Sequence, residues 1–253
     1  MIEIIDFTRR FGSYTAVDRM NLNIEAGCVF GLLGPNGAGK TTTVKSIVGA
    51  IKPSSGKILI NKKDVNLFPV EVKSIIGFVP ENPVVFKSLT GLEYLYLVGK
   101  LYHIENATLE KKINDILGRF DLTERAGEQI IAYSKGMVQK LVIASAFLHN
   151  PSILILDEPL TGLDAKSVAI LKQVITSFAS RGKTVVFCSH ILEIVEKLCD
   201  RMAILHNGRI LSTGTSWDII EQTKCKTLEE AFIKLTGETD ITKEAADIVS
   251  SLE

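Results

Sequence analysis

The 253-residue sequence contains little cysteine, a single tryptophan and no net charge. Its four cysteines form no C-x-x-C pair, so they indicate neither a zinc site nor a disulfide framework and fit a reducing compartment. Lys and Arg number 29, as do Asp and Glu, so no overall positive charge points to nucleic acid. The remaining composition, 46% hydrophobic and 23% charged, is typical of a globular protein with a buried core.

Long apolar runs are also absent. No segment approaches the roughly 18 to 20 residues of a membrane-spanning helix. The first six residues include acids and lack the pattern of a signal peptide. We therefore expect a cytoplasmic protein, or one held at the membrane only through a partner.

The clearest positive signal is a phosphate-binding loop. It follows the apolar run 28–33 and precedes a helical segment, 41–49, which is the context that such a loop requires. Its glycines allow backbone N–H groups to point at phosphate oxygens, and the start of the helix adds positive potential. The predicted ATP-binding residues are Gly34, Pro35, Asn36, Gly37, Ala38, Gly39, Lys40, Thr41 and Thr42. Lys40 would reach the β- and γ-phosphates, and the Thr41 hydroxyl would bind Mg²⁺.

Two later strands also end in polar side chains. The apolar run 153–156 leads into Asp157 and Glu158, and the run 184–187 leads towards His190. Ligands of open parallel sheets bind at the carboxyl ends of the strands. We therefore expect Asp157 to hold Mg²⁺, Glu158 to polarise the attacking water, and His190 to contact the γ-phosphate. On its own, a solvated acidic pair or an incidental histidine would be an adequate alternative.

The pattern of elements predicts an α/β fold. Strand-like runs alternate with helical stretches, which indicates a mainly parallel sheet with crossover helices. Residues 2–30 are expected to form strands, and residues 90 to about 127 a helical block. Ser134 is positioned to cap a further helix, where its hydroxyl and free N–H groups would form a second anion site. A hairpin turn is predicted at 206–209, and a capping box at 227–230.

Together these segments resemble the nucleotide-binding domain of ATP-binding-cassette (ABC) transporters, over residues 1 to 215. The phosphate loop, the segments 133–137, 153–158 and 160–164, and His190 occur in the order of that family. The resemblance implies a P-loop NTPase core, an N-terminal antiparallel β subdomain and an inserted α-helical subdomain at about 82–145. Residues 216–253 would form a C-terminal helical extension.

The resemblance also implies roles that the local patterns do not. Phe11 would stack on adenine, with Tyr14 as a neighbouring candidate. Ser134 and Gly136 would contact an ATP held by a second chain, and Asp164 would lie in the loop that joins the two sites. The helical block would receive a membrane-spanning subunit.

The sequence departs from the family pattern at two places. Residues 133–137 read Tyr-Ser-Lys-Gly-Met instead of Leu-Ser-Gly-Gly-Gln, and Glu81 replaces the glutamine that follows the third strand. A carboxylate at Glu81 can face Mg²⁺ or its water but cannot donate an amide hydrogen bond. Both departures resemble the drug-export, or ABC-2, branch of the family.

The predicted function is therefore that of an ATP-hydrolysing transporter subunit with ATP and Mg²⁺ as cofactors. It would form a homodimer, bind an integral membrane permease on the cytoplasmic face and bind no nucleic acid. One alternative is a soluble ABC ATPase that acts on a cytosolic assembly or nucleic acid, and another is a non-catalytic regulator. Residues 61–64, Asn-Lys-Lys-Asp, match the guanine motif of GTPases, but they lie too close to the phosphate loop and read as a polar turn.

Overall fold

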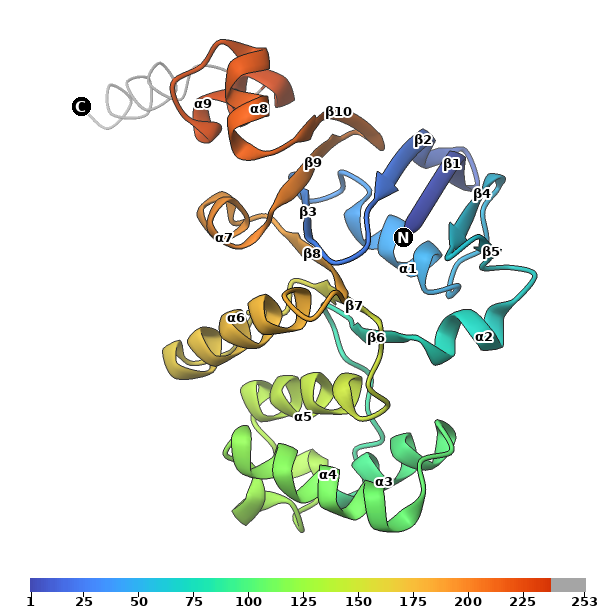
Figure 1. Ribbon diagram of the computed structural model, residues 1–253, viewed down its shortest axis with the longest axis vertical. Helices are drawn as coiled ribbons and strands as arrows, with labels where there is room; N and C mark the ends of the chain where they lie inside the picture. The colour runs from blue at the N-terminus through green and yellow to red at the C-terminus, as the bar shows by residue number, and fades with distance from the viewer. Residues whose placement is uncertain (238–253) are drawn as a thin grey trace.

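The computed structural model describes residues 1–237, which form two β-sheets with helices packed around them (Figure 1). The smaller sheet is antiparallel, in the order β2-β1-β4-β5. Its strands are β1 (Ile2–Phe11), β2 (Tyr14–Ile24), β4 (Ser55–Ile60) and β5 (Lys63–Asp64). The N-terminal antiparallel subdomain predicted from the sequence is thus confirmed.

The larger sheet has the order β10-β9-β3-β8-β7-β6 and is parallel except at the β10–β9 pair. Its central strands are apolar runs that are buried on both faces, as expected for a parallel sheet. The strands are β3 (Val29–Leu33), β6 (Ile76–Val79), β7 (Ile153–Asp157), β8 (Thr184–Ser189), β9 (Arg201–His206) and β10 (Arg209–Gly214). The predicted hairpin joins β9 to β10, with Asn207 and Gly208 both at positive φ.

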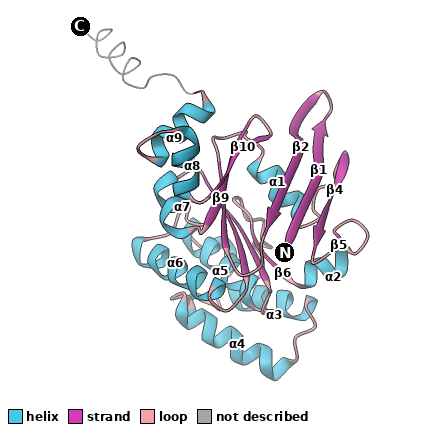
Figure 2. Ribbon diagram, turned by 45° about the horizontal axis from the view of Figure 1, so that its top comes forward, coloured by secondary structure: helices cyan, strands magenta, loops and turns pink. Residues whose placement is uncertain are grey.

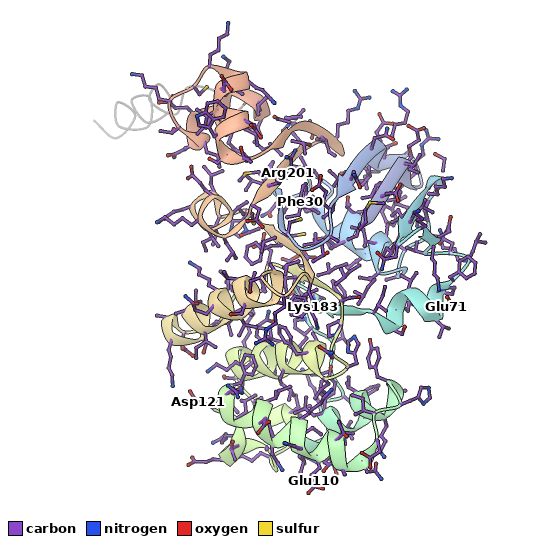
Figure 3. The ribbon with its side chains drawn as sticks, viewed as in Figure 1. Phe30, Glu71, Glu110, Asp121, Lys183 and Arg201 are labelled. Atoms are coloured by element: carbon purple, nitrogen blue, oxygen red, sulfur yellow. The ribbon has the colours of Figure 1, made fainter. Side chains whose placement is uncertain are left out.

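Each face of the larger sheet has its own hydrophobic core. On one face, α1 (Lys40–Ile47) is enclosed between the two sheets, in a core to which Phe7, Phe30 and Ile47 contribute. Phe30 is labelled in Figure 3. The other face is covered by α5 (Lys135–Phe147), α6 (Ala165–Ala179) and α7 (Leu192–Leu198), as Figure 2 shows. The smaller sheet with α1, the larger sheet, and the helices α5, α6 and α7 therefore form three layers. The phosphate loop lies at the carboxyl end of β3, an inner strand of the larger sheet.

A helical block is inserted between β6 and β7. It contains α3 (Gly91–Leu101) and α4 (Asn106–Arg119), with 3₁₀ turns at Thr123–Arg125 and Ile130–Ala132 before α5. Leu95, Ile113 and Leu141, one from each helix, meet in a third core. The inserted helical subdomain is thereby confirmed, while its boundaries at 82 and 145 remain predictions.

The last two helices in the described part of the chain are α8 (Ser216–Thr223) and α9 (Leu228–Thr236). The predicted capping box at 227–230 was half wrong. Thr227 Oγ1 accepts a hydrogen bond from the Glu230 N–H at 3.2 Å, but the Glu230 carboxylate accepts from the N–H of Lys226, one residue earlier, at 2.8 Å. The rest of the predicted C-terminal extension, residues 238–253, lies outside the described residues.

One short helix was not predicted. Helix α2 (Pro69–Ser74) precedes β6 and has proline at its first position, where no helical N–H is needed. None of the helices described is both long and apolar enough to cross a bilayer.

Candidate nucleotide site

The phosphate loop connects β3 to α1 and is held by contacts within itself. Gly39 caps the helix at φ 106°, and a Cβ there would lie 2.8 Å from the carbonyl oxygen of Ala16, so only glycine fits. The buried Lys40 ammonium donates to the carbonyl oxygens of Gly34, at 2.6 Å, and Pro35, at 3.1 Å. The loop therefore presents its backbone and a lysine around one point at the start of α1.

A cleft of about 550 Å³ opens in front of this loop. This volume lies within the range of pockets that bind small molecules. Eleven of the predicted site residues line it: Phe11, Asn36, Gly37, Ala38, Gly39, Lys40, Thr41, Thr42, Glu81, Glu158 and His190. Tyr14, Ala16 and Thr161 complete the wall. The structure thus brings together residues that are separated by up to 179 positions (190 − 11) in the chain.

Asp157 ends β7 and is fully buried behind the cleft. Within residues 1–237, neither of its carboxylate oxygens has a hydrogen-bond partner that meets normal geometry. Burial raises the pKa of Asp157 from 3.8 to about 6, which nearby Glu81 and Glu158 reinforce and which Thr41 and Lys40 partly oppose. A buried carboxylate with unpartnered oxygens is unfavourable in itself and suits a cation.

Glu158 is held by Ser189, the last residue of β8, and by His190, which follows it. Its Oε1 lies 2.8 Å from His190 Nδ1, and Ser189 Oγ donates to its Oε2 at 3.3 Å. Its φ of 48° is left-handed, a conformation that is strained for a residue with a side chain and is common at functional sites. The backbone turn directs Glu158 into the cleft, whereas its neighbour Asp157 stays in the interior. Sequence analysis gave the two carboxylates different roles, but it did not predict the hydrogen bond between Glu158 and His190.

The outer wall of the cleft is aromatic. Phe11, at the end of β1, and Tyr14, at the start of β2, are 45% and 59% exposed, which leaves both rings accessible to a planar ligand. The guanidinium of Arg9 lies over the Phe11 ring, 4.4 Å from its centre, in a cation–π contact.

Ser134 and Gly136 do not line the cleft. They lie at the start of α5, where Ser134 Oγ accepts a hydrogen bond from the Met137 N–H at 3.2 Å, as predicted for a helix cap. A Cβ at Gly136 would lie 2.6 Å from the Gly162 carbonyl oxygen, so this glycine permits close packing against the loop after β7. Within one chain, the two predicted anion sites are therefore separate.

Sequence analysis missed the contacts that join α5 to the loop after β7. The buried Gln139 donates from Nε2 to the Pro159 carbonyl at 3.0 Å, and Lys140 forms an ion pair of 3.0 Å with Asp164. Asp164 also caps α6 by accepting from the Ser167 N–H at 2.8 Å. Of these residues only Asp164 lies in a segment that the motifs mark, and only the folded chain shows which residues touch.

The fold and the cleft define a class of protein. A parallel sheet that carries a phosphate loop after β3 and an acid pair at the end of β7, two strands away in the sheet, is a P-loop nucleotide-binding domain. The two sheets and the inserted helical block distinguish the kind of P-loop protein further.

Comparisons with known proteins identify that kind. Residues 17–161 match the family model described as "ABC transporter". The chain is 35% identical to the ABC transporter ATP-binding protein NatA of Bacillus subtilis over 238 residues, which cover 92% of this chain and 97% of NatA. It is 34% identical to the linearmycin resistance ATP-binding protein LnrL of the same organism, covering 87% of this chain and 70% of LnrL.

Solved structures agree with the sequence relatives. An ATP-binding subunit of an ABC transporter superposes with a TM-score of 0.88 at 33% identity, covering 93% of this chain and 99% of that one. A dimeric ATP-binding cassette in a post-hydrolysis state with ADP and Pi gives a TM-score of 0.77 at 26% identity, covering 85% of this chain and 98% of that one. The chain belongs to the ABC transporter family, and it is an ATP-binding and ATP-hydrolysing subunit of that family.

Proposed function

We propose that this chain hydrolyses ATP to energise export through a separate membrane-spanning partner, and that it works as a pair of identical chains. The export direction is supported by relatives named for resistance to linearmycin and for bacitracin transport; the latter, BcrA of Bacillus licheniformis, is 37% identical over 212 residues. Two features of the sequence point the same way, namely Glu81 and the motif at 133–137.

The observation that carries the catalytic part is the position of Glu158. Its carboxylate lies in the same cleft as Lys40 and is held by His190 and Ser189. In this arrangement Glu158 orients and polarises the attacking water, and Lys40 stabilises charge on the β- and γ-phosphates. His190 holds Glu158 through one ring nitrogen, which leaves its other nitrogen to face the γ-phosphate. Phe11 stacks on the adenine ring at the outer wall.

The residues present fit a bound Mg²⁺. Asp157 offers two buried oxygens without partners. The Thr41 hydroxyl and the Glu81 carboxylate both line the cleft and both lie near enough to Asp157 to affect its pKa. Among residues 1–237, no three or more His, Cys, Asp or Glu side chains are grouped so that they could hold a metal ion by themselves. Mg²⁺ in nucleotide sites takes only one or two carboxylates plus substrate phosphates. Mg²⁺ would neutralise charge that develops on the phosphates.

The proposed pairing of two chains is supported by the separation of Ser134 and Gly136 from the cleft. A helix start with a serine cap, a glycine and no acid in its first turn is suited to an anion. The relative solved with ADP and Pi is a dimer, which supports the proposal that Ser134 and Gly136 complete the site of a second chain.

The membrane partner is proposed to dock beside the helical block. In the segment before α3, Val84 is 95% exposed and Phe86 is 63% exposed. Exposed apolar side chains in one segment are typical of an interaction site. The chain would then lie on the cytoplasmic face of the membrane, held there by its partner, with no part in nucleic-acid binding.

Copurification tests this proposal. The chain, tagged and extracted from its native membrane in mild detergent, is expected to retain an integral membrane protein and a second copy of itself. Recovery of only soluble partners would instead favour an ABC ATPase that acts on a cytosolic assembly. A salt-sensitive complex with RNA or DNA would favour the nucleic-acid alternative.

Dilution of the purified chain tests the pairing. Because the two anion sites lie apart in one chain, specific ATPase activity should fall as the concentration drops below the range in which dimers form. ATP binding should persist there, since the cleft and its lysine belong to a single chain. A specific activity that stays constant on dilution would contradict the composite site.

A further inference from the structure

A second hollow lies along α6, away from the nucleotide cleft. Three adjoining cavities of about 380, 350 and 310 Å³ all include Val174 in their walls. We call their union the α6 groove. Its apolar lining comes from three helices, α4, α5 and α6, and consists mainly of Ile116, Phe120, Phe147, Ile170, Val174 and Phe178.

The groove follows one side of α6. Ile170, Val174 and Ser177 are spaced by four and three residues, which places them in one row along α6, and Arg181 follows just after the helix ends. The row from Ile170 to Ser177 is about 10 Å long at the rise of an α-helix. Figures 1 and 2 both show α5 beside α6, and the lining residues Phe147 and Val174 come from these two helices.

Cations stand at both ends of the groove. Arg119 lines the end formed by α4, and Arg181 and Lys183 line the other end. Among residues 1–237, no carboxylate forms an ion pair with any of the three. The groove therefore combines an apolar floor with positive charge that has no counterpart in the described chain.

Lys183 is held in place at its end of the groove. Its Nζ donates to the carbonyl of Pro151 at 2.8 Å and to Asn150 Oδ1, and it lies 4.7 Å from the centre of the Phe178 ring; Lys183 is labelled in Figure 3. Burial lowers the pKa of Lys183, and the charges of Arg181 and Lys112 lower it further. Lys183, Arg181 and Lys112 thus lie close enough for their charges to interact, and a bound anion would relieve their mutual repulsion.

From this geometry we propose that the α6 groove binds a free amphipathic anion with a single unbranched apolar chain, of the fatty-acid type. The apolar tail of this ligand would lie over Val174 and Phe147, and its head group would contact Arg181 and Lys183. The apolar residues in a row along α6 suit one unbranched tail, and the charge of Arg181 and Lys183 at the end of that row selects a negative head. The proposal concerns a site distinct from the nucleotide cleft and does not depend on the direction of transport.

Calorimetric titration with decanoate, kept below its micelle concentration, tests the proposal. Decanoate should bind with one site per chain, and the uncharged 1-decanol should bind at least tenfold more weakly because it lacks the charge-assisted contacts. Hexanoate should also bind at least tenfold more weakly, since each methylene group removed weakens apolar binding roughly fourfold.

Two variants locate the site by different physical means. Arg181→Glu reverses the charge at the head position and should weaken decanoate binding at least tenfold. Ser177→Trp places a bulky side chain in the groove from an exposed position on α6, and it should block binding without any change of charge. Lys62→Glu, a charge reversal in an exposed turn between β4 and β5, is the matched control and should bind decanoate like the parent.

Each remaining outcome would overturn the proposal. Equal binding by the parent, Arg181→Glu and Ser177→Trp would show association elsewhere on the surface. Binding of 1-decanol as tight as that of decanoate would remove the role of the cations. Recruitment to phosphatidylglycerol vesicles that depends on Arg181, with no binding of free decanoate, would assign the patch to a membrane surface instead. Circular dichroism of each variant establishes that it is folded.

Discussion

Replacing Asp157 by asparagine should make the protein more stable while it removes Mg²⁺-dependent hydrolysis. Asp157 is fully buried, its oxygens have no hydrogen-bond partner in the described chain, and its pKa rises from 3.8 to about 6. A rise of this size corresponds to about 3 kcal/mol of instability in the charged form, since each pKa unit is worth about 1.4 kcal/mol. Such a residue is retained for what it binds, at the expense of stability.

The sign of the effect sets its pH dependence. Because the folded pKa lies above the unfolded value, the folded state holds its proton more tightly, and the charge destabilises the fold as pH rises. The penalty is present in full above about pH 6; it falls to about 1 kcal/mol at pH 4.5 and disappears below the unfolded pKa. Asparagine carries no charge at any pH, so Asp157→Asn should gain about 1–3 kcal/mol at pH 7, and less at pH 4.5.

Urea denaturation without nucleotide or Mg²⁺, at both pH values, measures this gain. For a chain of this size, each kcal/mol also moves the melting temperature by about 2–4 °C. The control is Asp115→Asn on the exposed side of α4, which should change stability by no more than about 0.5 kcal/mol. The reasoning fails if Asp157→Asn is less stable than the parent at pH 7, or if its gain does not depend on pH.

Three further substitutions test other contacts of the site. Glu158→Gln should keep ATP binding but lose on the order of 10² to 10⁴ in turnover, and hydrolysis at the parent rate would mean that another group polarises the water. Phe11→Ala should weaken ATP binding by about 1–3 kcal/mol through lost stacking, whereas Phe11→Tyr should restore it; equal Kd values for all three proteins, measured with a fluorescent ATP analogue, would exclude stacking at this ring. Gln139→Leu should destabilise the fold by about 1–3 kcal/mol in urea, because the buried Pro159 carbonyl loses its donor, and Gln173→Leu on the exposed side of α6 should be nearly neutral; similar losses in both would count against the buried bond.

Local chemistry explains why part of the fold was predictable. The hairpin at 206–209 depends on two residues that tolerate positive φ, and the phosphate loop depends on glycines followed by Lys40. Signals of this kind are complete within a few neighbouring residues. The capping box at Thr227 is also a local signal, but the prediction was half wrong because the flexible Glu230 side chain has two backbone N–H groups within reach, and the sequence does not specify which it takes.

The composition of the cleft was predictable only where a motif marked its residues. Thr161 lines the cleft because the loop after β7 returns to the phosphate loop, and Gln139 reaches Pro159 because α5 packs against that loop. Both contacts are set by how elements pack, over separations that periodicity and turn chemistry do not encode. The α6 groove was missed for the same reason: Arg119 and Arg181 are 62 positions apart (181 − 119) and share a hollow only in the folded chain.

The two hydrogen bonds that Lys40 makes to its own loop bear on how quickly the site fills and empties. Fixing a lysine side chain costs up to about 2 kcal/mol in conformational freedom, and here that loss is already met during folding. An arriving phosphate competes with two carbonyl oxygens for an ammonium that is already in position. Nucleotide exchange is then a substitution of acceptors around one nitrogen atom, and a departing product leaves behind a loop that is ready for the next turnover.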